Sequence, residues 1–349
     1  MDTIIKQCYG IDISKLDFSV CLSSELTSGN TLFSKVEKFA NNRQGFNQFL
    51  KWSRKVGSAS PESFFVMEAT GIYYENLAYH LHKLKKSVCV LLPNKVKHFA
   101  KSLNIVSKND LIDARILAHL GIERRLDLWP RPSTLFKELR DLTRLCGDLK
   151  KERTVFSNRN EIVKYGVNIH PLVKRTNDKI LKELGKQIDK CEDEIYKVLH
   201  KEKWLSDKVT KLLSIKGIGL TSIAIILAET QGFSLITSRK QLASYAGYDV
   251  VERQSGTSVK GRTRISKRGN SRIRACMHFP AMVASRFNSD LKEDYQRIIK
   301  NKPSKMIGIT ALQRKLLLLT YTLWKKDEYY LEPEERTSGI HGTKLLLRN

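Results

Sequence analysis

The sequence has no apolar run that approaches the roughly 18 residues of a membrane-spanning helix, and its amino terminus lacks a signal-peptide pattern. We therefore expect a cytoplasmic protein that has no membrane partner. The six cysteines are scattered without a Cys-x-x-Cys pair, and the eight histidines show no metal-ligand spacing. Neither a disulfide framework nor a zinc site is indicated. Residues 1–125 also lack a glycine-rich phosphate loop, which argues against an actin-like ATPase.

Negative charge is scarce in this chain. Its 349 residues include 62 Lys and Arg but 36 Asp and Glu, so the formal net charge is +26. A chain this basic is untypical of metabolic enzymes and indicates a nucleic-acid partner. Hydrophobic residues make up 41% of the sequence, which is enough for real cores, and the length predicts two or three domains.

Strand-like and helix-like patterns alternate in the first 128 residues. Two strands are expected within 4–22, one at each of 31–39, 63–67 and 87–92, and helices at 43–56, 73–84, 94–103 and 110–122. That order predicts an N-terminal α/β domain, residues 1–128, built on a mixed sheet with crossover helices.

Residues 129–202 follow a heptad pattern that is interrupted at Gly166–Pro171. In the first stretch, one heptad position holds Leu135, Leu142, Leu149, Phe156 and Val163, and the other holds Leu139 and Cys146. The second stretch has Leu181, Leu184, Ile188, Cys191, Ile195 and Val198. Charged residues surround both stretches, as in coiled-coil helices. The pattern predicts a coiled-coil helical arm, and it fits dimerisation and a hairpin within one chain equally well.

Residues 203–332 are expected to form a mainly helical C-terminal domain, followed by a polar tail at 333–349. Residues 209–228 have the pattern of a helix, a Gly-x-Gly turn and a second helix. Such a helix-hairpin-helix can aim backbone N–H groups at a phosphate through Gly217 and Gly219. A simple helical turn is the alternative.

The stretch Val251–Arg274 combines a serine with a row of cations, and it contains no acidic residue after Glu252. Its glycines predict a loop or hairpin before a helix that starts near Asn270. The cations are Lys260, Arg262, Arg264, Lys267, Arg268, Arg272 and Arg274. They can neutralise a row of phosphates. Ser255 places a hydroxyl next to these cations, although an ordinary turn serine fits the same residues.

Four acidic residues of the N-terminal domain are candidates for catalysis, namely Asp12, Glu68, Asp110 and Asp113. Asp12 and Glu68 end strands, whereas Asp110 and Asp113 share one face of a helix. If they converge at one sheet edge, their oxygen ligands suit Mg²⁺ or Mn²⁺, ions that assist phosphoryl transfer. The alternatives are an N-cap at Asp110, with Asp113 in the first helical turn, and a turn role for Asp12.

Seven short motifs carry a family resemblance. They are Gly10-Ile-Asp12, Met67-Glu-Ala-Thr-Gly71, Asn109-Asp-Leu-Ile-Asp-Ala114, Leu213-Ser-Ile-Lys-Gly-Ile-Gly219, Leu242-Ala-Ser-Tyr-Ala-Gly247, Gln254-Ser-Gly256 and Ile265-Ser-Lys-Arg-Gly-Asn270. With these motifs in this order, nearly the whole chain resembles the DEDD-type insertion-sequence transposases. That family has an RNase H or RuvC-like N-terminal domain and a serine-bearing C-terminal transposase domain. It includes bridge-RNA-guided recombinases, and the pilin-gene invertases are relatives.

The resemblance implies that Asp12, Glu68, Asp110 and Asp113 form a metal-binding tetrad and that Ser255 is a nucleophile that links transiently to DNA. It also implies a dimer or tetramer held partly by the arm, and a structured non-coding RNA that selects donor and target DNA. The Tyr248-Asp249 pair stands where many relatives carry a Pro-containing turn. This departure affects none of the proposed catalytic residues.

Two other functions fit the same residues. One is a RuvC-like nuclease or junction resolvase that uses metal-bound water, with Ser255 as a bystander. The other is a non-catalytic scaffold that binds nucleic acid. A covalent protein–DNA link separates the transposase from the nuclease, and metal-dependent strand cleavage excludes the scaffold.

Overall fold

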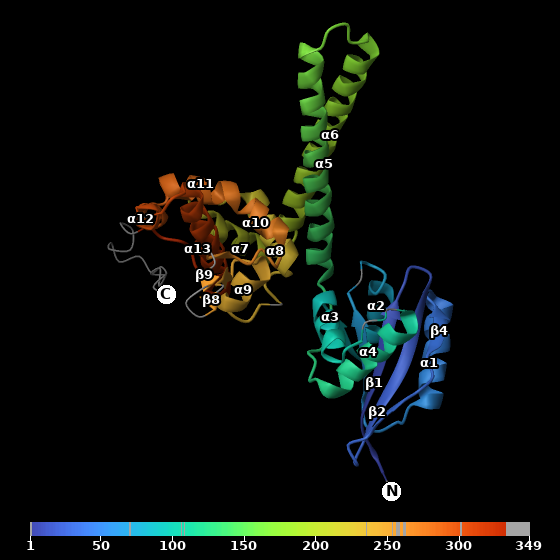
Figure 1. Cartoon of the computed structure of the whole chain (residues 1–349). Coiled ribbons are helices and arrows are strands. Elements are labelled where there is room, and N and C mark those ends of the chain that lie inside the picture. The colour runs from blue at the N-terminus through green and yellow to red at the C-terminus, as the bar shows by residue number, and fades with distance from the viewer. Residues whose placement is uncertain are drawn as a thin grey trace. The chain divides into compact units, whose positions relative to one another are not determined.

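The computed structural model of the chain forms two compact units, Met1–Arg131 and Pro132–Asn349 (Figure 1). It describes residues 2–332 except 70, 106, 108, 235, 253, 256–258, 261, 262 and 301, and at 254–255 and 259–260 it describes the backbone alone. The first unit is a mixed α/β structure, and the second is mainly helical. In the described part of the chain, every helix is too short or too polar to cross a membrane.

The first unit is built on a mixed sheet whose strand order is β3-β2-β1-β5-β6, with β4 also paired to β2. The strands are β1 (Ile4–Ile13), β2 (Asp17–Leu26), β3 (Thr31–Phe33), β4 (Glu37–Ala40), β5 (Ser63–Glu68) and β6 (Ser87–Leu91). β1 and β2 are antiparallel, whereas β5 lies parallel to both β1 and β6. The mixed sheet expected from the sequence is therefore present.

The single strand expected at 31–39 is in fact two strands, β3 and β4, that pair with different parts of β2. Ser34 lies between them, and its Oγ accepts a hydrogen bond from the backbone N–H of Leu22 at 3.0 Å. A side chain thus takes the place of a backbone acceptor at this point and interrupts the ladder.

Four helices cover the two faces of the sheet: α1 (Arg43–Val56), α2 (Glu75–Lys83), α3 (Pro93–Ser102) and α4 (Asp110–Glu123). Alternate residues of β1 enter separate cores, because successive side chains of a strand point to opposite faces. Ile11 packs in one core with Phe49 of α1 and Leu77 of α2. Cys8 packs in the other core with Leu117 of α4. Helices α3 and α4 therefore share the face to which Cys8 points.

The second unit begins with two long helices, α5 (Thr134–Tyr165) and α6 (Pro171–His200), which pack side by side as a hairpin (Figure 1). The remaining helices are α7 (Lys203–Leu213), α8 (Leu220–Thr230), α9 (Arg239–Ala246), α10 (Ser271–Cys276), α11 (His278–Phe287), α12 (Ser289–Ile299) and α13 (Lys305–Lys326). Four two-residue strands lie between α9 and α10: β7 (Val250–Val251), β8 (Gln254–Ser255), β9 (Val259–Lys260) and β10 (Arg264–Ile265).

The heptad residues near the base of the arm are used within the chain. Leu139 and Cys146 of α5, together with Ile188 and Ile195 of α6, are buried in the core of the second unit. The far end of the hairpin differs, because Tyr165 is 83% exposed and several other apolar residues there are also exposed. The seam at the base therefore stabilises an intrachain hairpin.

The turn between α7 and α8 contains the two glycines of the Gly-x-Gly pattern. Gly217 has a φ of 106°, and a Cβ at this position would lie 2.8 Å from the backbone N of Ala284 in α11. Packing against α11 therefore requires a glycine at 217, whatever the turn binds. A Cβ on Gly219 would meet no atom within 4 Å, so this position is open to an approaching group.

Candidate functional site

Two of the candidate acids lie side by side at the carboxyl ends of neighbouring strands. Asp12 is the last residue but one of β1, and Glu68 is the last residue of β5. The parallel register pairs Ile11 with Met67, the residues that immediately precede them. Both acids are half-buried. Strand pairing alone thus brings these two carboxylates to one edge of the sheet.

The direction of α4 brings the other two acids toward the same edge. A Cβ on Gly121 would lie 2.0 Å from Sγ of Cys8, and a Cβ on Gly10 would lie 2.2 Å from the carbonyl oxygen of Ala114. Helix α4 therefore runs antiparallel to β1, in close backbone contact that only glycine at position 10 permits. Because Asp12 follows Gly10 on the same face of β1, the first turn of α4 approaches Asp12.

That first turn carries Asp110 and Asp113. The helix starts at Asp110 because Oδ1 of Asn109 accepts a hydrogen bond from the backbone N of Ile112 at 2.8 Å. The N-cap is therefore Asn109, so a capping role for Asp110 is wrong, whereas Asp113 does lie in the first turn. Carboxylates at this position are stabilised by the helix dipole.

A lysine lies close to this acidic edge. Lys38 of β4 pairs in register with Ser19, and Ser19 pairs with Asp12. The Nζ of Lys38 is 3.0 Å from Oδ2 of Asp17. The hydrogen bond with Asp17 raises the pKa of Lys38, and the charge of Asp110 adds to the shift. The main ionic partner of Lys38 is thus Asp17, and Asp110 acts on it more weakly.

The donor chemistry of the four acids fits a hard divalent cation, because every available ligand is a carboxylate oxygen. As the side chains stand, however, no three His, Cys, Asp or Glu residues in the described part of the chain are grouped closely enough to hold a metal ion. The backbone therefore brings the acids toward a common edge, and Asp12, Glu68, Asp110 and Asp113 would have to move closer together to hold a cation there.

Ser255 lies in a short β-hairpin. Strands β8 and β9 are antiparallel, with Ser255 opposite Val259 and Gln254 opposite Lys260. A hairpin in this stretch was expected from its glycines. The side chains of Ser255 and Lys260, and all of Gly256 and Arg262, lie outside the described residues.

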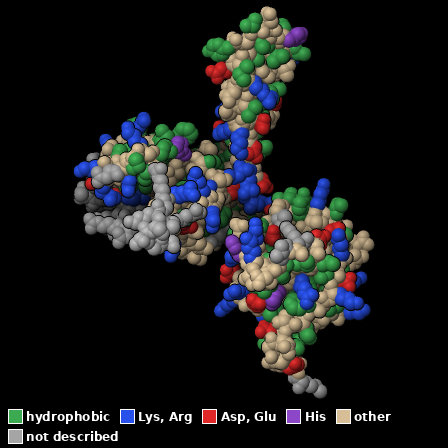
Figure 2. All heavy atoms as spheres, viewed as in Figure 1, with side chains coloured by type: hydrophobic (Ala, Val, Ile, Leu, Met, Phe, Trp, Pro, Cys, Tyr) green, Lys and Arg blue, Asp and Glu red, His purple; other side chains and the backbone are tan. Residues whose placement is uncertain are grey.

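The described cations of this stretch divide into two groups. Arg264, Lys267 and Arg268 are exposed. In contrast, Nη1 of Arg274 donates a hydrogen bond to the carbonyl oxygen of Ala246 at 2.7 Å, and Nη2 of Arg272 lies 3.8 Å from Oδ1 of Asp148. The first group is therefore better placed to contact phosphates, and the second group also contributes to the fold. Lys and Arg side chains are spread over the visible surface of both units (Figure 2).

Family models match both the segment that contains the four acids and the segment that contains Ser255. Residues 9–162, which include all four acids, match a DEDD-type transposase model. Residues 209–296, which include Ser255 and the basic stretch, match the model described as "Transposase IS116/IS110/IS902 family". Together the two matches span more than half of the chain. The protein belongs to this family of transposases.

Two relatives of this transposase are named for a DNA rearrangement. The chain is 28% identical over 324 residues to the pilin gene-inverting protein of Moraxella bovis, an alignment that covers 92% of this chain and 97% of the relative. The pilin gene-inverting protein of Moraxella lacunata gives the same identity and coverage. The transposase is therefore a DNA recombinase that acts on DNA, and its DEDD class is divalent-metal dependent.

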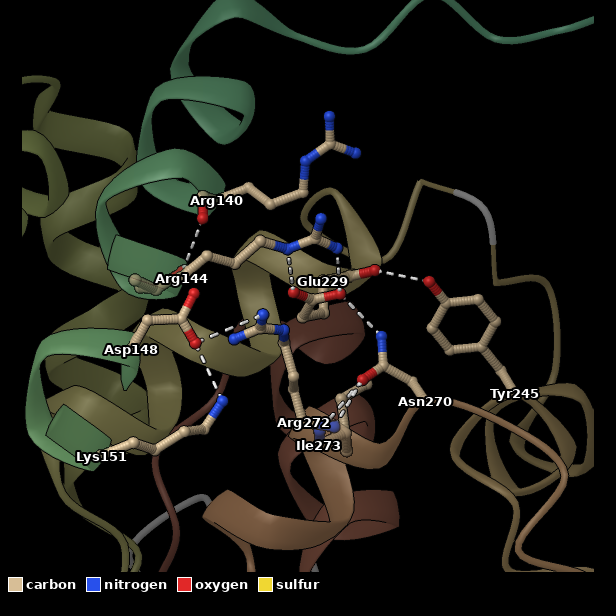
Figure 3. A network of polar contacts seen from close by, with 10 residues as sticks. Arg140, Arg144, Asp148, Lys151, Glu229, Tyr245, Asn270, Arg272 and Ile273 are labelled. Atoms are coloured by element: carbon tan, nitrogen blue, oxygen red, sulfur yellow. Dashed lines mark hydrogen bonds and ion pairs between the residues drawn. The ribbon is translucent and has the colours of Figure 1, made fainter. Parts of the chain in front are cut away.

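Sequence reasoning missed one polar cluster in the transposase. Glu229 in α8 is buried and contacts Arg144 of α5 and Asn270 before α10 (Figure 3). One signal was available, since Glu229 is the only charged residue of helix Leu220–Thr230 and follows the apolar run Ile223–Ala228. An isolated buried carboxylate requires a partner, but the sequence does not reveal which residue supplies it.

Proposed function

We propose that this transposase exchanges DNA strands through a covalent link to Ser255 and that Asp12, Glu68, Asp110 and Asp113 hold the divalent metal. The observation that supports the proposal is that the backbones of β1, β5 and α4 bring their acids toward one sheet edge. The same placement of acids on a mixed sheet leads us to assign residues 1–128 to the RNase H or RuvC-like class. A bound Mg²⁺ or Mn²⁺ supplies Lewis-acid stabilisation to the phosphate under attack.

The chemistry of Ser255 is an ester exchange. Its Oγ attacks the scissile phosphorus and loses its proton, a new O–P bond forms, and the P–O bond to the leaving strand breaks. The released strand takes up a proton and ends in a hydroxyl. One phosphodiester replaces another, so the reverse step can rejoin DNA without an energy source. A serine hydroxyl is a weak nucleophile without activation, which explains the need for the acids.

The competing function is a nuclease or junction resolvase that uses the same acids and a water molecule as nucleophile. The two functions differ in whether they produce DNA that is covalently joined to the protein. With Mg²⁺ and DNA that carries the recombination ends, the transposase should leave protein covalently joined to DNA after denaturation. Efficient cleavage that leaves every DNA end free of protein would instead support the nuclease.

We infer that Arg264, Lys267 and Arg268, together with Lys260 and Arg262, contact phosphates of DNA, of a structured guide RNA or of both. The turn at Gly217 and Gly219 is proposed as a further phosphate contact of the helix-hairpin-helix type. The support is the exposure of the three described cations and the net charge of +26.

Changing Arg264, Lys267 and Arg268 together to Ala should weaken binding to duplex DNA and flatten its dependence on salt. Three lost phosphate contacts should reduce the slope of log K against log[salt] by about 2.7. Fluorescence anisotropy over a salt series measures this slope. A matched control removes the same charge from exposed Lys51, Arg54 and Lys55 of α1, and its slope should be that of the unmodified protein. Equal slopes for both triple variants would contradict the proposed contact.

We also propose that the transposase works as a dimer or tetramer and that the far end of the arm joins the subunits. Its exposed apolar residues include Ile162, Val167 and Leu172, at 69%, 86% and 58% exposure. Figure 2 shows hydrophobic side chains at this end of the arm. The heptad residues Leu139, Cys146, Ile188 and Ile195 nearer the base are buried within the chain, so the exposed apolar side chains at the far end are the better candidates for contact with another subunit.

Changing Ile162, Val167 and Leu172 to Ser should lower the particle mass measured by light scattering while the chain stays folded, because these side chains are exposed in the single chain. Changing buried Ile188 to Ser should mainly lower the thermal midpoint of unfolding and have little effect on the particle mass. An unchanged particle mass in the triple variant would show that the end of the arm does not join subunits.

A further inference from the structure

Glu229 is a buried carboxylate at the centre of a polar cluster, with 5% of its surface exposed (Figure 3). Arg144 of α5 binds it with two hydrogen bonds, from Nε to Oε1 at 2.9 Å and from Nη2 to Oε2 at 3.0 Å. The Nδ2 of Asn270 donates to Oε2 at 2.7 Å, and the hydroxyl of Tyr245 donates to the carbonyl oxygen of Glu229, also at 2.7 Å. One residue thus connects α5, α8, α9 and the start of α10.

The charge state of Glu229 follows from these contacts. Burial alone would raise the pKa of Glu229, but the hydrogen bonds from Arg144 and Asn270 outweigh it and hold the pKa below its ordinary value. Reciprocally, the hydrogen bond to Glu229 raises the pKa of Arg144. The pair is therefore ionised in the folded chain, and a two-pronged contact of this kind fixes direction as well as distance.

Asn270 connects Glu229 to the segment of the chain that contains Ser255. Its Oδ1 accepts hydrogen bonds from the backbone N of Arg272 and of Ile273 at 3.0 and 3.1 Å, which caps α10. Its own backbone N donates to the carbonyl oxygen of Tyr245 at 2.7 Å. Asn270 therefore joins the end of α9 to the start of α10, the two helices between which the Ser255 segment lies.

The segment between these helices forms a stem. Strand β7 pairs with β10, with Val250 opposite Ile265 and Val251 opposite Arg264. Next to this pairing, on the side of α9 and α10, the backbone N of Ser266 donates a hydrogen bond to the carbonyl oxygen of Asp249 at 2.7 Å. The β8–β9 hairpin with Ser255 lies in the chain between the two sides of this stem. The direction of the stem is thus set where it meets α9 and Asn270.

We propose that Glu229 is a positioning residue, which fixes the stem that bears Ser255 to helix α5 of the arm through Arg144 and Asn270. The placement of the stem that leads to Ser255 then follows the orientation of the arm. The weaker contact between Arg272 and Asp148 of α5 reinforces the same connection. This inference rests on the proposed role of Ser255 as nucleophile, but the mechanical connection itself can be measured independently of any reaction.

The test compares Glu229→Gln and Arg144→Lys with the unmodified chain. Both changes keep a polar side chain of similar size but remove the two-pronged ionic contact. The first readout is the distance between spin labels at Leu145 of α5 and Thr263 beside β10, both exposed. We expect a narrow distance distribution in the unmodified chain and a broad one in both variants. The second readout is formation of the Ser255–DNA link, which should fall by roughly 100-fold, as expected when a reacting group is misplaced by about 1 Å.

A matched control separates positioning from general stability. Asp294 of α12 accepts hydrogen bonds from Arg297, at 2.6 Å, and from Lys315, within the same unit. Asp294→Asn should lower the thermal midpoint but leave both the label distances and the rate of DNA linkage unchanged. If Glu229→Gln and Arg144→Lys keep the narrow distribution, or lose linkage only in parallel with stability, Glu229 is merely structural and the proposal fails. If the unmodified protein forms no link through Ser255, the proposed function fails, and the label distances still decide whether Glu229 fixes the stem.

Discussion

Asp12→Asn should abolish recombination by this transposase and leave its binding to DNA unchanged. The substitution keeps the size of the side chain and removes one negative oxygen ligand. Loss of the metal's stabilisation of the transferred phosphate is worth several kcal/mol, so strand exchange should fall by about 1000-fold or more. Glu68→Gln, Asp110→Asn and Asp113→Asn should act in the same direction. Strand exchange between plasmid-borne ends measures the effect.

Asp17→Asn provides a matched control for this prediction. Asp17 begins β2 and binds Lys38, so it is a carboxylate in the same sheet but outside the tetrad. We expect Asp17→Asn to retain activity. Wild-type rates in Asp12→Asn, or full activity of the unmodified protein in excess chelator, would remove the metal from the mechanism. An equal loss in Asp17→Asn would instead indicate a general effect of charge on this edge.

Ser255→Ala should eliminate the covalent link between protein and DNA, because alanine has no oxygen to form the new bond with phosphorus. Binding to DNA and RNA should persist, since the exposed cations of the segment are unchanged. The loss of strand exchange should be as complete as the loss of the link, because the proposed route has no other nucleophile. Denaturing electrophoresis with labelled DNA separates linked from free strands.

Ser271→Ala is the corresponding serine control. Ser271 is exposed and starts α10, sixteen residues along the chain from Ser255. Its loss should leave both the link and strand exchange intact. A normal link in Ser255→Ala would exclude this serine as nucleophile. Continued metal-dependent cleavage without a link in Ser255→Ala would point to water as a second, competing nucleophile.

Local sequence patterns predicted the mixed sheet and the positions of Asp12 and Glu68 near the ends of two of its strands. Asp12 is the last residue but one of a largely buried strand and Glu68 is the last residue of another, and residues at the carboxyl ends of neighbouring parallel strands necessarily lie close together. The position of α4 was harder to predict. It depends on Gly10, which lets the strand backbone touch the backbone of α4, and on Gly121, which leaves room for the side chain of Cys8. A glycine in a strand pattern does not identify the helix that it will meet.

Contacts between distant residues could not be predicted from local patterns. Arg144 and Glu229 are 85 residues apart, and no periodicity links them. The inward hydrogen bond of Arg274 was missed for the same reason, since a row of cations in the sequence does not show which of them the fold uses. The heptad pattern predicted the arm helices, but only tertiary packing shows that its base is buried within the chain.

The most direct test of the account is to identify the amino acid that is joined to DNA. The unmodified protein should be incubated with Mg²⁺, DNA that carries the recombination ends, and RNA transcribed from the DNA flanking its gene. After nuclease and protease digestion, mass spectrometry should find a nucleotide on the peptide that contains Ser255, and the adduct should disappear when metal or RNA is omitted. Strand exchange without any adduct, or an adduct on another residue, would contradict the assignment of Ser255 as the nucleophile.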